Sequence, residues 1–299
     1  MDALILSQAS PEEAYRKFES LANRHIDALR KITKSIQDSR LQRDNEGIKK
    51  SLQEFDEQLE KYIPVLMSQC KIYWDRENWG QVEKLLRQSA EFCADHEVWK
   101  LNVAHTFFVQ ENKYKETVRY YEPIVKKYTE NMLSLTAIVV ANLCVSYIMV
   151  DQNEEAEEIM RKLEREEEKQ TFQTPDKPVY HLCIVNLVIG TLYCAKGNYE
   201  FGIGRIIKSL EPYNKKLSMD TWYYAKRCLL SLIETLAKHM IILKDSIFSE
   251  ILEFLDVCDQ FGRNIQTVLN PLESHSTEKT SVSYEARLIK RMFLKIISE

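Results

Sequence analysis

The sequence predicts an all-α fold in which helix pairs stack into a repeat array, an α-solenoid. Seven Gly and seven Pro residues are few for a chain of 299 residues, so long helices meet little interruption. Apolar residues recur at helical spacing through most of the chain, and one pattern of small, large and turn residues returns several times. With 44% hydrophobic and 29% charged residues, the composition favours a folded helical protein over a disordered chain.

The clearest copy of this pattern lies between Asn186 and Tyr199. Gly190 leaves room for two helix backbones to approach, Tyr193 fills the interface, and Gly197 can take the left-handed conformation that ends a helix. This order is typical of the tetratricopeptide helix pair. We therefore predict a tetratricopeptide-repeat superhelix, preceded by a long helical hairpin, that binds another molecule and catalyses no reaction.

Three further segments fit the same frame. An aromatic or polar residue opens each second helix, and a first-helix partner precedes it by six positions every time. Successive openings are 35, 39 and 46 residues apart, compared with about 34 in the family repeat, which indicates insertions. The openings are Trp79, Tyr114, Asn153 and Tyr199, with partners Tyr73, Phe108, Tyr147 and Tyr193.

The chain is predicted to have three parts. Residues 1–62 form a long amphipathic helical hairpin packed on the solenoid, residues 63–269 form the repeats with a divergent capping helix pair, and residues 270–299 form a loop and a C-terminal helix. Each repeat buries its apolar face on a neighbour, so length does not set the number of domains. The expected repeats are 63–96, 97–132, 136–170 and 179–216.

The hairpin begins with a helix-start signal, Ser10 as a possible cap and Pro11 at the first helical position. A second apolar stripe runs into the first repeat through Pro64, where we predict a kink. Coiled-coil dimerisation is the alternative reading of such stripes. Too few heptads are sustained for it, so an intramolecular hairpin is favoured.

The sequence also predicts the structure of the insertions and of the C-terminal segment. Residues 164–169 predict a solvated helical extension, followed by a loop through Pro175 and Pro178. Asp151 and Glu154 have the spacing of a capping box at a helix start. Trp222 opens one helix of the capping pair, residues 247–258 line the other, and a basic amphipathic helix over roughly 284–297 is expected to pack back onto them.

No residue constellation indicates catalysis, a metal or a cofactor. The six histidines are scattered without a ligand spacing, and seven widely spaced cysteines predict buried thiols in a reducing compartment. Gly202 and Gly204 resemble part of a phosphate loop but follow no strand, so close helix packing explains them better. The net charge of −4, without a basic patch, gives no sign of nucleic-acid binding, and no long uncharged apolar run supports membrane insertion.

The first helices of the repeats should line a concave groove. The lining is mostly apolar, which suits an extended partner segment and disfavours a carboxylate clamp for acidic chain ends. No small-molecule substrate is expected. The predicted groove residues are Met67, Lys71, Trp74, Asn102, Thr106, Ala141, Val145, Ile148, Leu187, Thr191 and Cys194.

Several long stretches of the sequence resemble one known protein family. The chain resembles the tetratricopeptide repeat protein 30 family, subunits of the intraflagellar transport B complex. Members carry additional N-terminal repeats, so we expect the chain to correspond to the C-terminal portion. The stretches that carry the resemblance are residues 111–115, 120–127, 141–149, 180–199, 209–216 and 221–227.

The resemblance implies a non-enzymatic scaffold for anterograde ciliary transport, cilium assembly and polyglutamylation of axonemal tubulin. It implies two partners, an extended segment of intraflagellar transport protein 52 and the neighbouring intraflagellar transport protein 88, and a location in the cilium and in the cytoplasm at the ciliary base. The alternative is a cytosolic tetratricopeptide adaptor that acts as an oligomer outside cilia. A tubulin-modifying ligase would require nucleotide binding, for which no motif is present.

Overall fold

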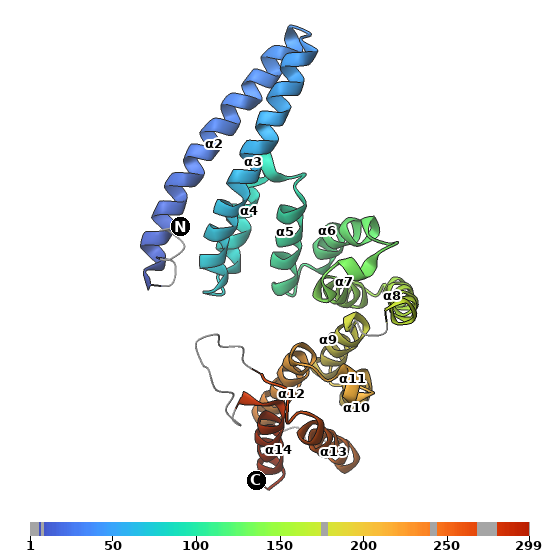
Figure 1. Cartoon of the computed structure of the whole chain (residues 1–299). Helices are drawn as coiled ribbons and strands as arrows, with labels where there is room; N and C mark the ends of the chain where they lie inside the picture. The colour runs from blue at the N-terminus through green and yellow to red at the C-terminus, as the bar shows by residue number, and fades with distance from the viewer. Residues whose placement is uncertain (1–5, 7–8, 175–178, 240–243, 268–279, 299) are drawn as a thin grey trace. The chain divides into compact units, whose positions relative to one another are not determined.

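The computed structural model describes residues 6, 9–174, 179–239, 244–267 and 280–298. Over these ranges the chain is built of α-helices arranged in successive pairs, which confirms the predicted all-α, tetratricopeptide-like fold class (Figure 1). The chain divides into an N-terminal unit, Met1–Ile124, and a C-terminal unit, Val125–Glu299. The expected loop at Pro175 and Pro178 and most of the loop after residue 270 lie outside the described residues.

The N-terminal unit opens with the predicted hairpin. Helices α2 (Pro11–Leu41) and α3 (Asn45–Trp74) lie side by side (Figure 1). Pro11 occupies the first helical turn as expected, but the side chain of Ser10 makes no capping hydrogen bond. Buried residues of α2 such as Leu29 join one hydrophobic cluster with the C-terminal half of α3. The apolar stripe of α2 is therefore covered within the same chain.

Helix α3 continues through Pro64 to Trp74. Proline has no N–H, so one backbone hydrogen bond of the helix is missing at this residue. The carbonyl oxygen of Pro64 accepts a hydrogen bond from Ser68 Oγ at 2.7 Å. The same helix thus supplies one arm of the hairpin and the first helix of the first repeat. The boundary expected at residue 62 lies inside a helix.

The second helices begin where the repeat frame places them. Helices α4, α6, α8 and α10 start at Trp79, Tyr114, Asn153 and Tyr199, so all four predicted openings are confirmed. The remaining bounds are α4 Trp79–Cys93, α5 Glu97–Val109, α6 Tyr114–Lys127, η1 Met132–Ser134, α7 Ala137–Met149, α8 Asn153–Gln173, α9 His181–Ala195, α10 Tyr199–Ser209, α11 Tyr213–Lys216, α12 Met219–His239, α13 Asp245–Phe261 and α14 Val282–Ser298.

Three of the turns within the pairs share one geometry. A residue with positive φ stands two positions before the second helix, and the next N–H donates to the carbonyl of the tyrosine five residues back. These bonds measure 3.0, 2.8 and 2.9 Å from Asn78, Gln152 and Asn198 to Tyr73, Tyr147 and Tyr193. They satisfy carbonyls that a helix end would leave free.

Only the last of these turns uses glycine. Gly197 has a φ of 83°, whereas Glu77 and Asp151 adopt 55° and 63°, which side chains rarely do. The capping box predicted for Asp151 and Glu154 is therefore wrong. Asp151 turns the chain, and the residue that caps α8 is Gln152, whose side chain makes no capping bond.

Helices α9 and α10 approach closely through two glycines. A Cβ built on Gly190 would lie 2.8 Å from the carbonyl oxygen of Gly202, and one on Gly202 would lie 2.6 Å from that of Gly190. Close packing is thus the reason for Gly190 and Gly202, as expected. For Gly204 the expectation is wrong, since a Cβ there would meet no atom within 4 Å.

The acidic extension of α8 is not merely solvated. Glu166 Oε2 accepts the backbone N–H of Met132 at 2.8 Å, and Glu167 Oε1 accepts that of Leu182 at 2.6 Å. Burial raises the pKa of Glu167, and the bond from Leu182 opposes this rise. Since Leu182 lies in the first turn of α9, the carboxylate satisfies a free N–H at the positive end of that helix.

The C-terminal helix packs back onto the capping pair, as predicted, and begins at Val282. Trp222 of α12 is 1% exposed, and its Nε1 donates to Glu285 Oε2 of α14 at 2.8 Å. Lys226 Nζ donates to the same carboxylate at 2.9 Å. The indole and the ammonium therefore compensate one half-buried charge between the two helices.

All seven cysteines are buried, as expected from their apolar surroundings. Burial disfavours the thiolate and raises the pKa of both Cys70 and Cys194 to about 12. These thiols behave as small apolar side chains in the core.

Candidate protein-binding sites

The eleven predicted groove residues fall into both units. The set from Met67 to Thr106 belongs to the N-terminal unit, and the set from Ala141 to Cys194 belongs to the C-terminal unit. Their assembly into one groove stays a prediction, and each set is considered within its own unit.

Five of these residues are buried and form part of the core. Four of them lie on α7 and α9, which other helices cover on several sides, so that α7 buries the whole run 139–147, and Thr106 lies on α5. Such burial disfavours direct contact with a partner, because the core would have to open, and their role in the groove stays a prediction. The five are Thr106, Ala141, Val145, Leu187 and Cys194.

The other six are at least partly accessible. Lys71 forms an ion pair with Asp75 at 2.9 Å, Asn102 Nδ2 donates to the carbonyl of Val98 at 2.8 Å, and Thr191 Oγ1 donates to that of Leu187 at 2.8 Å. The accessible set is Met67, Lys71, Trp74, Asn102, Ile148 and Thr191.

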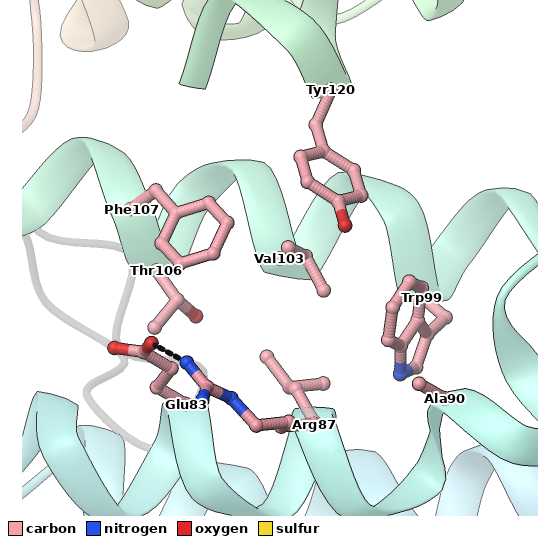
Figure 2. A pocket seen from close by; sticks show the side chains of 9 residues that line it. Glu83, Arg87, Ala90, Trp99, Val103, Thr106, Phe107 and Tyr120 are labelled. Carbon is pink, nitrogen blue, oxygen red and sulfur yellow. Dashed lines mark hydrogen bonds and ion pairs between the residues drawn. The ribbon is translucent and has the colours of Figure 1, made fainter. Parts of the chain in front are cut away.

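A pocket of about 210 Å³ opens in the N-terminal unit between α4, α5 and α6 (Figure 2). Its floor comes from α4, its aromatic side chains from α5 and α6. Thr106 lines it, which links this pocket to the predicted groove. The lining is Glu83, Leu86, Arg87, Ala90, Trp99, Val103, Thr106, Phe107 and Tyr120.

Three aromatic rings form the wall of the pocket. The ring of Tyr120 lies 6.3 Å from that of Trp99 and 5.8 Å from that of Phe107, at tilted or edge-on angles that aromatic pairs prefer. Trp99 is fixed because its Nε1 donates to Ser89 Oγ at 2.9 Å. The wall is therefore preorganised, which lowers the entropic cost of binding.

The rim at the other end is polar. Glu83 accepts hydrogen bonds from Lys113 at 2.6 Å, Gln110 at 3.1 Å and Arg87 at 2.9 Å. Burial opposes ionisation of Glu83, but these three donors together hold its pKa below the usual value. The carboxylate thus stays charged and ties α4 to the turn between α5 and α6.

The sequence predicts Thr106 as a residue of the concave groove, but it indicates neither this pocket nor the aromatic wall. A signal for the floor of the pocket is present on the second helix α4, where Glu83, Leu86 and Ala90 recur at three- and four-residue spacing and so share one face. Trp99 and Phe107 of the wall lie on the first helix α5, but outside the predicted groove set.

The half-buried His105 makes the N-terminal unit sensitive to acid. Burial lowers the pKa of His105 from 6.5 to about 4, and the Tyr121 hydroxyl lies within hydrogen-bonding distance of its Nδ1. Between these pH values the unfolded chain binds a proton that the folded chain does not. Stability is therefore full above pH 6.5 and falls as the pH drops to 4, by at most about 3 kcal/mol.

We expect the urea midpoint of the wild type to fall between pH 6.5 and pH 4, and that of His105→Gln to fall less. Glutamine keeps an acceptor for Tyr121 but does not titrate. Equal losses in both proteins would contradict the assignment to His105.

Within the described part of the chain, no group of three His, Cys, Asp or Glu side chains is placed to hold a metal ion. No helix in those ranges combines the length and apolar character needed to cross a membrane.

Paired helices with shared turns and an apolar pocket between neighbouring pairs define a tetratricopeptide-like helical-repeat protein. Residues 1–299 match the family described as intraflagellar transport protein 70 C-terminal domain. The chain belongs to this family, which is also the tetratricopeptide repeat protein 30 family named above.

Relatives from three vertebrates agree with the family match. Intraflagellar transport protein 70A1 of Mus musculus is 61% identical over 300 residues, 70B of Homo sapiens is 60% identical over 300 residues, and 70A of Danio rerio is 59% identical over 299 residues. Each alignment covers 99% of this chain and 45%, 45% and 46% of the relative, respectively. The chain thus spans less than half the length of these relatives.

Proposed function

We propose that this chain is a non-enzymatic scaffold segment of the intraflagellar transport machinery that holds an extended segment of a partner subunit. The family match over residues 1–299 supports the transport role, since the matched relatives are named as intraflagellar transport proteins. The helical-repeat fold supports the scaffold role, because such arrays present large surfaces to other chains.

The proposed partners are intraflagellar transport protein 52, bound through an extended proline-rich segment, and the neighbouring intraflagellar transport protein 88. Within the B complex, the chain would serve anterograde transport, cilium assembly and delivery of the factors for tubulin polyglutamylation. Its place would be the cilium and the cytoplasm at the ciliary base.

The observation that carries the binding role is the aromatic-walled pocket of the N-terminal unit. The side chains of Trp99, Phe107 and Tyr120 present ring faces and edges to a volume that suits one apolar side chain or a proline ring. Removing such a side chain from water stabilises a complex by about 1.5–3 kcal/mol before ordering costs.

Filling the pocket should weaken capture of the partner. Ala90 is half-buried in the lining, so Ala90→Phe places a ring where the ligand side chain would lie. We expect the Kd of purified intraflagellar transport protein 52 for the immobilised chain to rise at least about tenfold, the equivalent of one lost apolar contact.

Gln88→Phe is the matched control, because Gln88 is exposed on the same helix and does not line the pocket. It should capture the partner like the wild type. Equal capture by both variants would exclude the pocket as the contact, and no capture by the wild type, when a longer family member captures it, would reject the binding role of this segment.

A further inference from the structure

A second hollow lies in the C-terminal unit, and its chemistry differs from that of the first pocket. Its volume is about 420 Å³, and α9, α10 and α11 contribute its walls. Three cationic side chains face it alongside one carboxylate and one exposed ring. The lining is Asn186, Glu200, Phe201, Gly204, Arg205, Lys208, Ser209 and Lys216.

Arg205 is held in place at the centre of this hollow. Its Nε donates to Asn186 Oδ1 at 2.9 Å, one Nη2 hydrogen points to Met160 Sδ at 3.5 Å, and the guanidinium stacks 5.7 Å from the centre of the Phe201 ring. These contacts fix the plane of the fork and leave the Nη1 hydrogens without a bond in the described residues. A fixed guanidinium plane matches the two oxygens of a carboxylate.

Arg205 has no ion-pair partner among the residues that the structure describes. Two carboxylates in its surroundings are bound to other cations, Glu157 to Arg161 at 2.9 Å and Glu200, which lines the hollow, to Lys244 at 2.9 Å. Burial lowers the pKa of Arg205, which reflects a charge removed from water without full compensation. A half-buried cation of this kind gains free energy when an anion reaches it.

The neighbouring residues keep the hollow positive and accessible. Gly204 has no atom within 4 Å of a built Cβ, so the backbone beside Arg205 leaves space for a ligand. Lys208 stands one helical turn after Arg205, and Lys216 lies on α11 across the hollow. Because Glu200 is already paired, it does little to neutralise these cations.

We propose that this hollow binds acidic side chains within an extended segment of a partner protein, with Arg205 gripping one carboxylate and Lys208 and Lys216 attracting its neighbours. Three separated cations suit several carboxylates along one segment better than the single carboxylate of a chain end. The inference rests on the proposed function as a scaffold for extended segments and adds the chemistry of one contact.

The cationic residues of this hollow occupy other positions than those of the carboxylate clamp that the sequence disfavours. That clamp draws Lys, Arg and Asn from first-helix positions, whereas Arg205 and Lys208 belong to the second helix α10. A hollow of this kind is thus compatible with an apolar groove that does not bind acidic chain ends.

The test uses fluorescein-labelled peptides of alternating Glu and Ala, with blocked ends, and fluorescence anisotropy on the purified chain. We expect binding that weakens with added salt, and no binding of the matching Gln and Ala peptide. Arg205→Gln should raise the Kd about tenfold or more, and Arg205→Lys should also raise it because the fork is lost.

Arg227→Gln is the control, since Arg227 stacks on Tyr223 at 5.6 Å in the same manner but is exposed outside the hollow. It should bind the Glu peptide like the wild type. Unfolding of each variant, followed by circular dichroism, confirms that the fold persists.

Three outcomes would overturn the inference. They are equal binding by Arg205→Gln and the wild type, binding only of a peptide with a free C-terminus, and binding of inorganic phosphate in preference to the Glu peptide. If the wild type still captures intraflagellar transport protein 52 in any of these cases, the proposed function stands while this contact is rejected.

Discussion

Replacing Gly190 with leucine is expected to destabilise the C-terminal unit by about 3 kcal/mol. Even the Cβ of alanine would lie 2.7 Å from Ile206 Cγ1 and 2.8 Å from the carbonyl oxygen of Gly202. The second atom belongs to backbone and cannot rotate away, so α9 and α10 must separate. Separation would open the contact that also buries Ile203 and Cys194.

Alanine variants sharpen this test because they change one methyl group. Gly190→Ala should lower stability by about 1–3 kcal/mol, whereas Gly204→Ala should raise it by about 0.4–1 kcal/mol, since its Cβ meets open space on the same helix pair. Urea unfolding followed by circular dichroism measures both. Equal effects of the two variants would show that the close approach of the helices is not as described.

The second large effect is expected from Trp222→Ala. Trp222 is among the largest fully buried side chains and joins the cluster that also contains Phe254 and Phe293. Removing a buried tryptophan commonly costs about 3–5 kcal/mol. The variant also leaves Glu285 without its indole donor, so we expect the docking of α14 on α12 to be lost first.

Tyr223→Ala is the matched control for this variant. Tyr223 is the next residue on α12 but is 48% exposed, so its removal should change stability by no more than about 0.5 kcal/mol. Limited proteolysis provides a local readout, because release of α14 would expose new cleavage sites in residues 280–298. A Trp222→Ala protein that resists cleavage like the wild type would contradict the proposed role of the indole.

The starts of the second helices could be predicted because they depend on local geometry. The six-residue offset from Tyr73 to Trp79, repeated three times, reflects a turn of fixed length, and such turns are visible in one sequence. The close approach of α9 and α10 was readable for the same reason, since two backbones in contact require glycine at Gly190 and Gly202.

The groove lining could not be predicted in the same way. Position on a first helix tells which face a residue shares, but not whether another helix covers that face. Helical register predicts Leu187 and Ala141 in the groove, but both are fully buried because neighbouring helices pack on α7 and α9 from more than one direction. The floor of the aromatic pocket and Arg205 belong to second helices, which a rule about first helices leaves out. Trp99 and Phe107 lie on the first helix α5, but outside the positions expected to face the groove.

The turn residues show a further limit of sequence reasoning. Gly197 was recognised because glycine favours positive φ, but Glu77 and Asp151 take the same conformation without that signal. Their strain is compensated by the hydrogen bonds of Asn78 and Gln152 to the tyrosine carbonyls. Such compensation depends on neighbours and cannot be read from a single residue type.

The unbroken α3 gives the N-terminal unit a rod that joins two structural elements. Its 30 residues span about 45 Å, so the hairpin and the first repeat share one continuous helical backbone. Trimming the protein at residue 62 would cut this rod just where Tyr62, Ile63 and Leu66 anchor it. Shortened versions of the chain should therefore begin before Asn45, so that α3 stays whole and its buried residues keep covering α4.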